Sequence, residues 1–228
     1  MNGPRSLLSV SEAVLQRRSV RAFLPTPIDR ALVEAVLETS RFAPSGGNVQ
    51  PWHAVVVAGE PLAQLLLAAQ SALDAGGLVG DYQNYPEPLP DPWLARRRNC
   101  AADLYDAIDI GWNDRLARAA QTARNFVGFD APCILFCHMP RLMGAPQWAD
   151  LGLWLQTVML LLEEAGLGSC PQGAWSHVAT PIREALRIDA NHILYCGLAI
   201  GYRDPDAPVN GLRTSRAPLC DTIRFVGF

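Results

Sequence analysis

Residues 43–58 read APSGGNVQPWHAVVVA, and this stretch decides the fold class. Pro44 and the two glycines that follow Ser45 cannot continue a helix, because proline lacks a backbone N–H and glycine readily adopts positive φ. The apolar, β-branched run at residues 50–58 then predicts a buried strand. The segment is therefore expected to be a loop that delivers Ser45 and Asn48 to the side of a sheet.

Helical signals precede this loop. Ser9 and Glu12 are spaced as a capping box and predict a short helix that runs to about Arg18. Residues 26–29, TPID, predict the start of a second helix with Thr26 as its N-cap, because proline suits the first helical position. This second helix is expected to end before the proline of the loop.

The rest of the chain alternates between helices and strands without a regular βα repeat. Helices are expected at residues 61–74, 92–108, 113–127, 147–166 and 181–186, and further strands at 131–139 and 192–202. The stretch from 76 to 93 is rich in proline and aromatic residues, which predicts an extended arm packed on its own domain or on a partner subunit. The pattern favours an α+β fold, with a sheet layered between helices, over a strict doubly wound fold.

Composition limits the possible functions. The 228 residues suggest a single domain with an insertion at about 76–127, and all 19 cationic residues are arginine. A chain without lysine cannot form a Schiff base with pyridoxal phosphate, and it lacks the lysine of phosphate loops and kinases. Any anion site must therefore be built from arginine and backbone N–H groups.

Charge and hydropathy argue against nucleic-acid and membrane partners. The net charge is −3, and the only run of three basic residues, 96–98, is read as a solvated helix face. The most apolar stretch, 151–162, is too short to span a bilayer, and the N-terminus lacks an apolar run of signal-peptide length. The six cysteines form no CxxC pair, so we expect reduced thiols and a cytoplasmic protein without a metal site.

Two arginine clusters lie near opposite ends of the chain. Arg17, Arg18, Ser19 and Arg21 follow the first helix, where they could bind a phosphate or simply complement the helix dipole. Arg213 and Arg216 follow the last strand in a non-helical segment. Because chain termini often lie close together in compact domains, the two clusters could converge on one phosphate.

Other catalytic patterns are absent from the sequence. The four histidines show no metal-ligand spacing, and His53, His138 and His192 lie in or beside strand-like runs, so they are read as core or edge residues. No GxSxG follows a strand to suggest a hydrolase, and no GxGxxG to suggest a dinucleotide fold. The segment SCPQGAW at 169–175 is read as a turn with exposed backbone N–H groups and a positive φ at Gly173.

The order of four motifs resembles that of the nitroreductase family of FMN flavoenzymes, over nearly the whole chain. The motifs are RRSVRAF at 17–23, APSGGNVQPWHAVVV at 43–57, GLGSCPQG at 166–173 and GLAIGYRDPDAPVNGLRTSRAPL at 197–219. The resemblance is strongest to the nitrobenzoate and nitroaromatic reductases. It implies an α+β homodimer of the domain-swapped type, with a mostly antiparallel central sheet and two FMN molecules bound between the subunits.

The resemblance also implies a mechanism, in which hydride passes from NADH or NADPH through flavin N5 to a small acceptor such as a nitroaromatic or a quinone. No side chain is then catalytic, because the cofactor carries the chemistry. The positions matching the family's flavin contacts are Arg17, Arg18, Ser19, Arg21, Pro44, Ser45, Asn48, Pro171, Gln172, Gly173, Arg213 and Arg216. Those at 44–48 match the loop that reaches the flavin of the other subunit, and those at 171–173 match the turn beside N5.

Three departures from the family pattern leave alternatives open. Lysines that many members use are absent, Gln172 stands where many members have glutamate, and the 76–125 segment resembles a subgroup with a YPEP-like arm, where we expect acceptor preference to be set. An enone or other electrophile reductase of the same fold, or a flavin-binding protein without turnover, are the alternatives. Related enzymes that dehalogenate halotyrosines use what resembles a zwitterion clamp with a lysine on a lid. This chain has no lysine and cannot supply that clamp.

Overall fold

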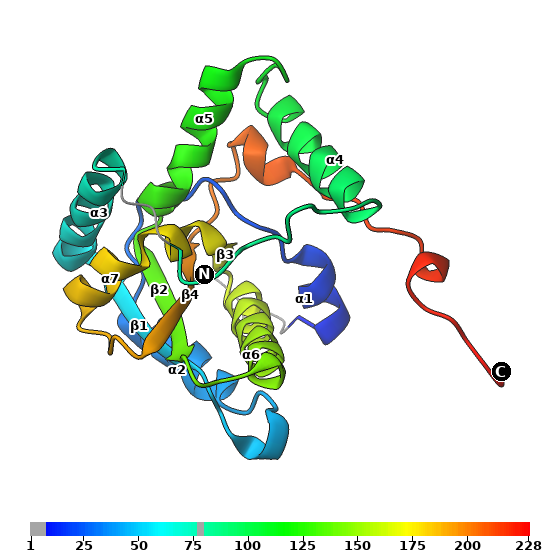
Figure 1. Cartoon of the computed structure of the whole chain (residues 1–228), viewed down its shortest axis with the longest axis horizontal. Coiled ribbons are helices and arrows are strands. Elements are labelled where there is room, and N and C mark those ends of the chain that lie inside the picture. The colour runs from blue at the N-terminus through cyan, green and yellow to red at the C-terminus, as the bar shows by residue number, and fades with distance from the viewer. Residues whose placement is uncertain (1–7, 77–79) are drawn as a thin grey trace, which may run out of the picture.

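A four-stranded antiparallel sheet forms the centre of the computed structural model, which describes residues 8–76 and 80–228 (Figure 1). Its strands are β1 (His53–Ala58), β2 (Cys133–Pro140), β3 (Gly168–Gln172) and β4 (His192–Gly201). Their spatial order is β1-β2-β4-β3, so β1 and β3 form the two edges. Residues 77–79 of the expected arm lie outside the described part of the chain.

Helices surround this sheet. They are α1 (Val10–Gln16), α2 (Arg30–Ser40), α3 (Gly59–Asp74), α4 (Trp93–Asp106), α5 (Arg115–Ala123), α6 (Ala145–Glu164) and α7 (Ala179–Leu186). Helices α4 and α5 contain no buried residue, and Figure 1 shows them projecting from the body. Within the described residues, no helix is both long and apolar enough to cross a membrane.

The two faces of the sheet bury two separate cores, because successive side chains of a strand point to opposite faces. On one face, Leu135 and Leu198 pack with α2 and α6. On the other face, Ile134 and Phe136 pack with α3, α7 and Trp175. The expected α+β class, with an antiparallel sheet between helices, is confirmed.

The predicted start of α1 is confirmed, whereas α2 begins later than predicted. Ser9 caps α1, and the side chain of Glu12 accepts a hydrogen bond from the Ser9 N–H at 2.8 Å, which completes the capping box. The N-cap of α2 is Asp29 instead of Thr26, because the Asp29 carboxylate accepts the Ala31 N–H at 2.9 Å. The helix therefore begins at Arg30, three residues after Pro27.

Two predictions about strands are wrong. Residues 50–58 were expected to form a buried strand, but β1 is an edge strand and Val56 on it is 40% exposed. The segment 169–175 was expected to form a turn, but its first four residues belong to β3, which pairs with β4 through Gln172, opposite Gly197. The sheet thus has a fourth strand, β3, which was not predicted because its Pro-Gln-Gly sequence is typical of a turn.

Candidate functional site

The two arginine clusters line one cavity of about 910 Å³, as their positions near opposite chain ends suggested. We call it the arginine cavity. Its polar lining side chains are Arg17, Arg18, Ser19, Arg21, Arg96, Asn99, Gln156, Arg213, Thr214, Ser215, Arg216 and Thr222. The sequence-predicted arginines at 17–21 and 213–216 are therefore brought together, and α4 adds Arg96 and Asn99, which the sequence reasoning did not include.

The first arginine segment, residues 17–21, is held against β3. Ser19 forms a parallel bridge with Ser169, and the Val20 N–H donates to the Ser169 carbonyl at 3.0 Å. The approach is close enough that a Cβ on Gly168 would lie 2.7 Å from a Val20 methyl. Glycine at 168 is thus required for this packing, which aligns the arginine segment with β3.

Asn210 fastens the second arginine segment, residues 212–217, to the first. This residue is 3% exposed, and its Oδ1 accepts the Arg21 N–H at 2.9 Å while its Nδ2 donates to the Ala22 carbonyl at 2.8 Å. The Asn210 carbonyl in turn accepts from Arg18 Nη1 at 3.0 Å. Asn210 therefore positions both segments, and the sequence reasoning missed it because its Asn-Gly pair looks like an ordinary turn.

The arginine cavity is strongly positive because six arginines line it, and backbone carbonyls fix the orientation of two of them. Arg213 Nη1 donates to the Leu15 and Gln16 carbonyls at the end of α1, at 3.0 and 3.2 Å, and Arg216 Nη1 donates to Thr214. Burial, together with nearby Arg203 and Arg213, lowers the pKa of Arg18 below its usual value. Such a donor set suits a phosphate dianion.

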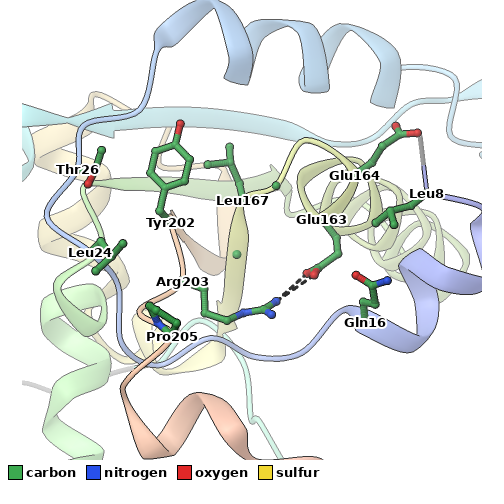
Figure 2. A pocket seen from close by; sticks show the side chains of 12 residues that line it. Leu8, Gln16, Leu24, Thr26, Glu163, Glu164, Leu167, Tyr202, Arg203 and Pro205 are labelled. Atoms are coloured by element: carbon green, nitrogen blue, oxygen red, sulfur yellow. Dashed lines mark hydrogen bonds and ion pairs between the residues drawn. The ribbon is translucent and has the colours of Figure 1, made fainter. Parts of the chain in front are cut away.

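A second cavity, of about 690 Å³, differs from the first in charge (Figure 2). Glu163 and Arg203 lie in this cavity, and Figure 2 shows their ion pair, with 3.0 Å between Oε1 and Nη2. The Glu163 side chain is 9% exposed, so its charge neutralises Arg203 locally. This cavity therefore lacks the surplus positive charge of the arginine cavity.

The segment 171–173 lies at the end of β3. Pro171 is exposed, whereas Gln172 is 2% exposed and its side chain points into the protein. Its Nε2 donates to the Asn125 carbonyl at 2.7 Å, and its Oε1 accepts from Trp175 Nε1 at 3.2 Å. Gly173 begins the 3₁₀ helix η3 (Gly173–Val178) and does not have the positive φ that was expected.

An extended strap, residues 80–92, covers the Gly173 end of β3. Its Tyr82 hydroxyl donates to the Tyr195 carbonyl, and its Asn84 Nδ2 lies 3.1 Å from His177 Nε2. A Cβ on Gly173 would lie 3.5 Å from Asn84 Oδ1. The first part of the predicted arm therefore packs on its own domain, over the place where the resemblance locates the flavin ring.

The loop with Pro44, Ser45 and Asn48 does not line the arginine cavity within one protomer. Ser45 Oγ accepts the Gln50 N–H at 3.0 Å, and the Gly46 N–H donates to Asp150 Oδ1 at 3.2 Å. The loop is folded by its own contacts and is largely exposed. Its predicted contact with the flavin of a second subunit remains a prediction.

Three histidines far apart in sequence meet on adjacent strands. His138 Nδ1 lies 2.7 Å from His192 Nδ1, and the His53 ring stacks on that of His138 with 5.5 Å between centroids. One ring nitrogen must donate and the other accept, so at least one of the two rings is neutral. The spacing of these histidines along the sequence did not predict the cluster, because the three residues meet only when β1, β2 and β4 lie side by side in the sheet.

The histidine cluster predicts that the protein loses stability in acid. Burial, followed by the proximity of His192 and His53, lowers the pKa of His138 from 6.5 to about 4, and burial also lowers that of His192 despite nearby Asp189. The unfolded chain takes up a proton near pH 6.5 and the folded chain only near pH 4. Stability should therefore fall as pH drops through this window, by roughly 2 to 3 kcal/mol for His138 between pH 7 and 4.5.

Urea unfolding of the wild type and of His138→Gln at pH 7 and 4.5 measures this effect. The acid loss should be smaller in the variant, because glutamine does not titrate. Equal losses in the two proteins would show that the cluster does not cause the decline.

Comparison with known proteins identifies relatives along nearly the whole chain. The model of the Nitroreductase family matches residues 14–202. The 4-nitrobenzoate reductase of Pseudomonas putida is 35% identical, with 94% of each chain covered. The crystal structure of the FMN and NADPH-dependent nitroreductase NfnB from Sphigopyxis sp. strain HMH is 46% identical with a TM-score of 0.95, covering 97% of this chain and all of the other. That of NfnB from Mycobacterium smegmatis in complex with NADPH is 31% identical, with a TM-score of 0.91 and 95% and 97% coverage.

Proposed function

Because this chain belongs to the nitroreductase family, we propose that it is an FMN-dependent oxidoreductase that passes hydride from NADH or NADPH to a nitroaromatic or quinone acceptor. The convergence of both arginine segments in one cavity carries the proposal. The relatives named above include a nitrobenzoate reductase and an FMN and NADPH-dependent nitroreductase, which supports this cofactor and acceptor class. We infer a cytoplasmic enzyme from the composition, with its reduced thiols.

The described residues fit FMN at two points along β3. The arginine cavity offers guanidiniums and hydroxyls for the phosphate, beside Ser19 and Ser169. Gly173 lies four residues further along, or about 13 Å at the usual rise of a strand, under the strap. This spacing suits an extended ligand with a phosphate at one end and an aromatic ring at the other.

The protein's part in the reaction is to bind, orient and shield. When bound, FMN would supply a hydride acceptor and donor at N5. The arginines neutralise the phosphate, and the backbone N–H of Gly173 would donate toward the ring and stabilise negative charge there. The strap, fixed by Tyr82 and Asn84, would limit water and shape the acceptor site.

We also propose one domain over residues 1–228 and a homodimer in which each tail covers the partner's sheet edge. Figure 1 shows the C-terminal tail leaving the body, and Phe225 and Phe228 on it are 64% and 105% exposed. Beside the free edge of β1 runs an apolar groove of about 860 Å³, with Val33, Val56 and Leu62 in its lining. We propose that the tail of a second copy, residues 223–228, lies in this groove, and the resulting interface should exceed about 2,000 Å².

Purification provides the direct test of the cofactor assignment. The protein should be yellow and should release FMN on denaturation, at one flavin per subunit. Arg216→Ala should weaken FMN binding by roughly 1.5 to 3 kcal/mol, the range for a charge-assisted contact, as measured by flavin fluorescence titration. Release of FAD, or no flavin after reconstitution, would refute the proposal, and an unchanged Kd would remove Arg216 from the site.

A further inference from the structure

The arginine cavity carries more positive charge than one phosphate can neutralise. Six arginine side chains line it, and among the described residues the only carboxylate within 4 Å of any of them is that of Asp221, 3.8 Å from Arg96. The nearby Glu163, which also influences Arg18, is already paired with Arg203. A phosphomonoester brings about 1.5 to 2 negative charges. Binding of the FMN phosphate would therefore leave a positive surplus.

The arginines come from two separate parts of the fold. Five belong to the segments at 17–21 and 212–217, which Asn210 ties together beside α1 and β3. The sixth, Arg96, comes from α4, the projecting helix, and Asn99 lies three residues further on. An i, i+3 pair occupies the same face of a helix, so both side chains can address one group. The flavin contacts implied by the family resemblance include neither residue.

We propose that Arg96 and Asn99 form a second phosphomonoester subsite in this cavity, which selects NADPH over NADH by binding its 2′-phosphate. This inference rests on the proposed function, because it assigns part of the hydride donor's site. NADPH and NADH differ only by that phosphate, and arginine is the side chain that accommodates it in other dinucleotide sites. The Asn99 amide can complement the 3′-hydroxyl, the one free hydroxyl on the ribose that carries this phosphate.

The neighbouring arginines supply a matched control. Arg97 lies over the Tyr85 ring, 4.2 Å from its centroid, and Arg98 is exposed and does not line the cavity. Arg98→Gln removes the same charge from the same helix as Arg96→Gln. Asp221→Asn removes the carboxylate partner of Arg96 but keeps Arg96 itself. It therefore tests whether the preference for NADPH depends on this ion pair or on the arginine.

The experiment measures kcat/KM for NADPH and NADH with the FMN-loaded protein. Arg96→Gln should lower the ratio of the two by about tenfold, the effect of one lost charge-assisted contact, while the NADH value and the FMN Kd stay within about twofold. Arg98→Gln should keep the ratio of the wild type, and Asp221→Asn should keep or raise it. The NADPH value should also fall more steeply with added salt than the NADH value.

A binding measurement provides a second readout without turnover. Adenosine 2′,5′-bisphosphate should bind the FMN-loaded wild type at least tenfold more tightly than 5′-AMP by calorimetry, and Arg96→Gln should remove the difference. Competition by inorganic phosphate at equal strength would mean a general anion site and would overturn the assignment to NADPH. An unchanged ratio in Arg96→Gln would also overturn it, as would an equal loss of FMN affinity. A protein that binds no flavin would instead refute the proposed function.

Discussion

Removal of residues 223–228 is expected to convert the protein from a dimer into a monomer that no longer retains FMN. The tail makes few contacts with its own protomer, since Ile223, Phe225 and Val226 are 48%, 64% and 72% exposed. The free edge of β1 likewise leaves backbone groups and Val56 without cover. Pairing of the tail with the β1 edge of a second copy would bury the exposed tail side chains and would give the free backbone groups of β1 hydrogen-bond partners. Because the loop at 44–48 is proposed to complete the partner's site, FMN affinity should fall by roughly a hundredfold or more.

Light scattering and flavin titration of the truncated protein test this expectation. The truncated chain ends at Thr222, so it keeps Thr222 in the arginine cavity and the contact between Asp221 and Arg96. Leu142→Asp is the matched control, because Leu142 is 84% exposed but lies in the turn after β2, away from tail and groove. The control should remain a yellow dimer. A truncated protein that stays dimeric with FMN bound would show that the tail does not hold the subunits together.

The sequence predicted most of the elements whose signals are local. The capping box of Ser9 and Glu12 and the apolar run at 131–139 identified α1 and β2, because caps and uninterrupted apolar stretches determine structure without distant partners. The strand β3 was missed because Pro171 and Gly173 favour a turn when they are read alone. Its pairing with β4 and the contact of Gly168 with Val20 depend on tertiary structure.

The candidate site was predictable only in part for the same reason. The sequence identified both arginine segments, and the structure places them in one cavity. It could not identify Asn210 or Arg96, whose importance comes from the segments that they meet. The histidine cluster likewise arises because β1 and β4 flank β2, an order that spacing along the chain does not encode. Residue types thus predict the chemistry of a site, whereas the topology decides which residues share it.

Substitution of Gly173 is expected to abolish flavin function while the protein stays folded. A Cβ at this position would lie 3.5 Å from Asn84 Oδ1, an ordinary contact, so the unloaded protein should accept Gly173→Ala. Gly173→Val places two further methyl groups against Asn84 and Tyr82 of the strap, beside which the ring is proposed to lie. We expect FMN binding, or reduction by NAD(P)H, to fall by at least about a hundredfold in the valine variant, and less in the alanine variant.

Substitution of the adjacent Gln172 should instead lower stability and leave flavin reduction nearly unchanged. Gln172→Ala leaves the Asn125 carbonyl and Trp175 Nε1 without their partner, so it should cost about 1 to 3 kcal/mol of stability for each group. Its side chain is buried and hydrogen-bonded to Asn125 and Trp175, so flavin reduction should stay within about tenfold of the wild type. Anaerobic stopped-flow reduction and urea unfolding of the Gln172 and Gly173 variants separate the two roles. A loss of reduction rate in Gln172→Ala as large as that in Gly173→Val would mean that the glutamine amide, and not the backbone, acts on the flavin.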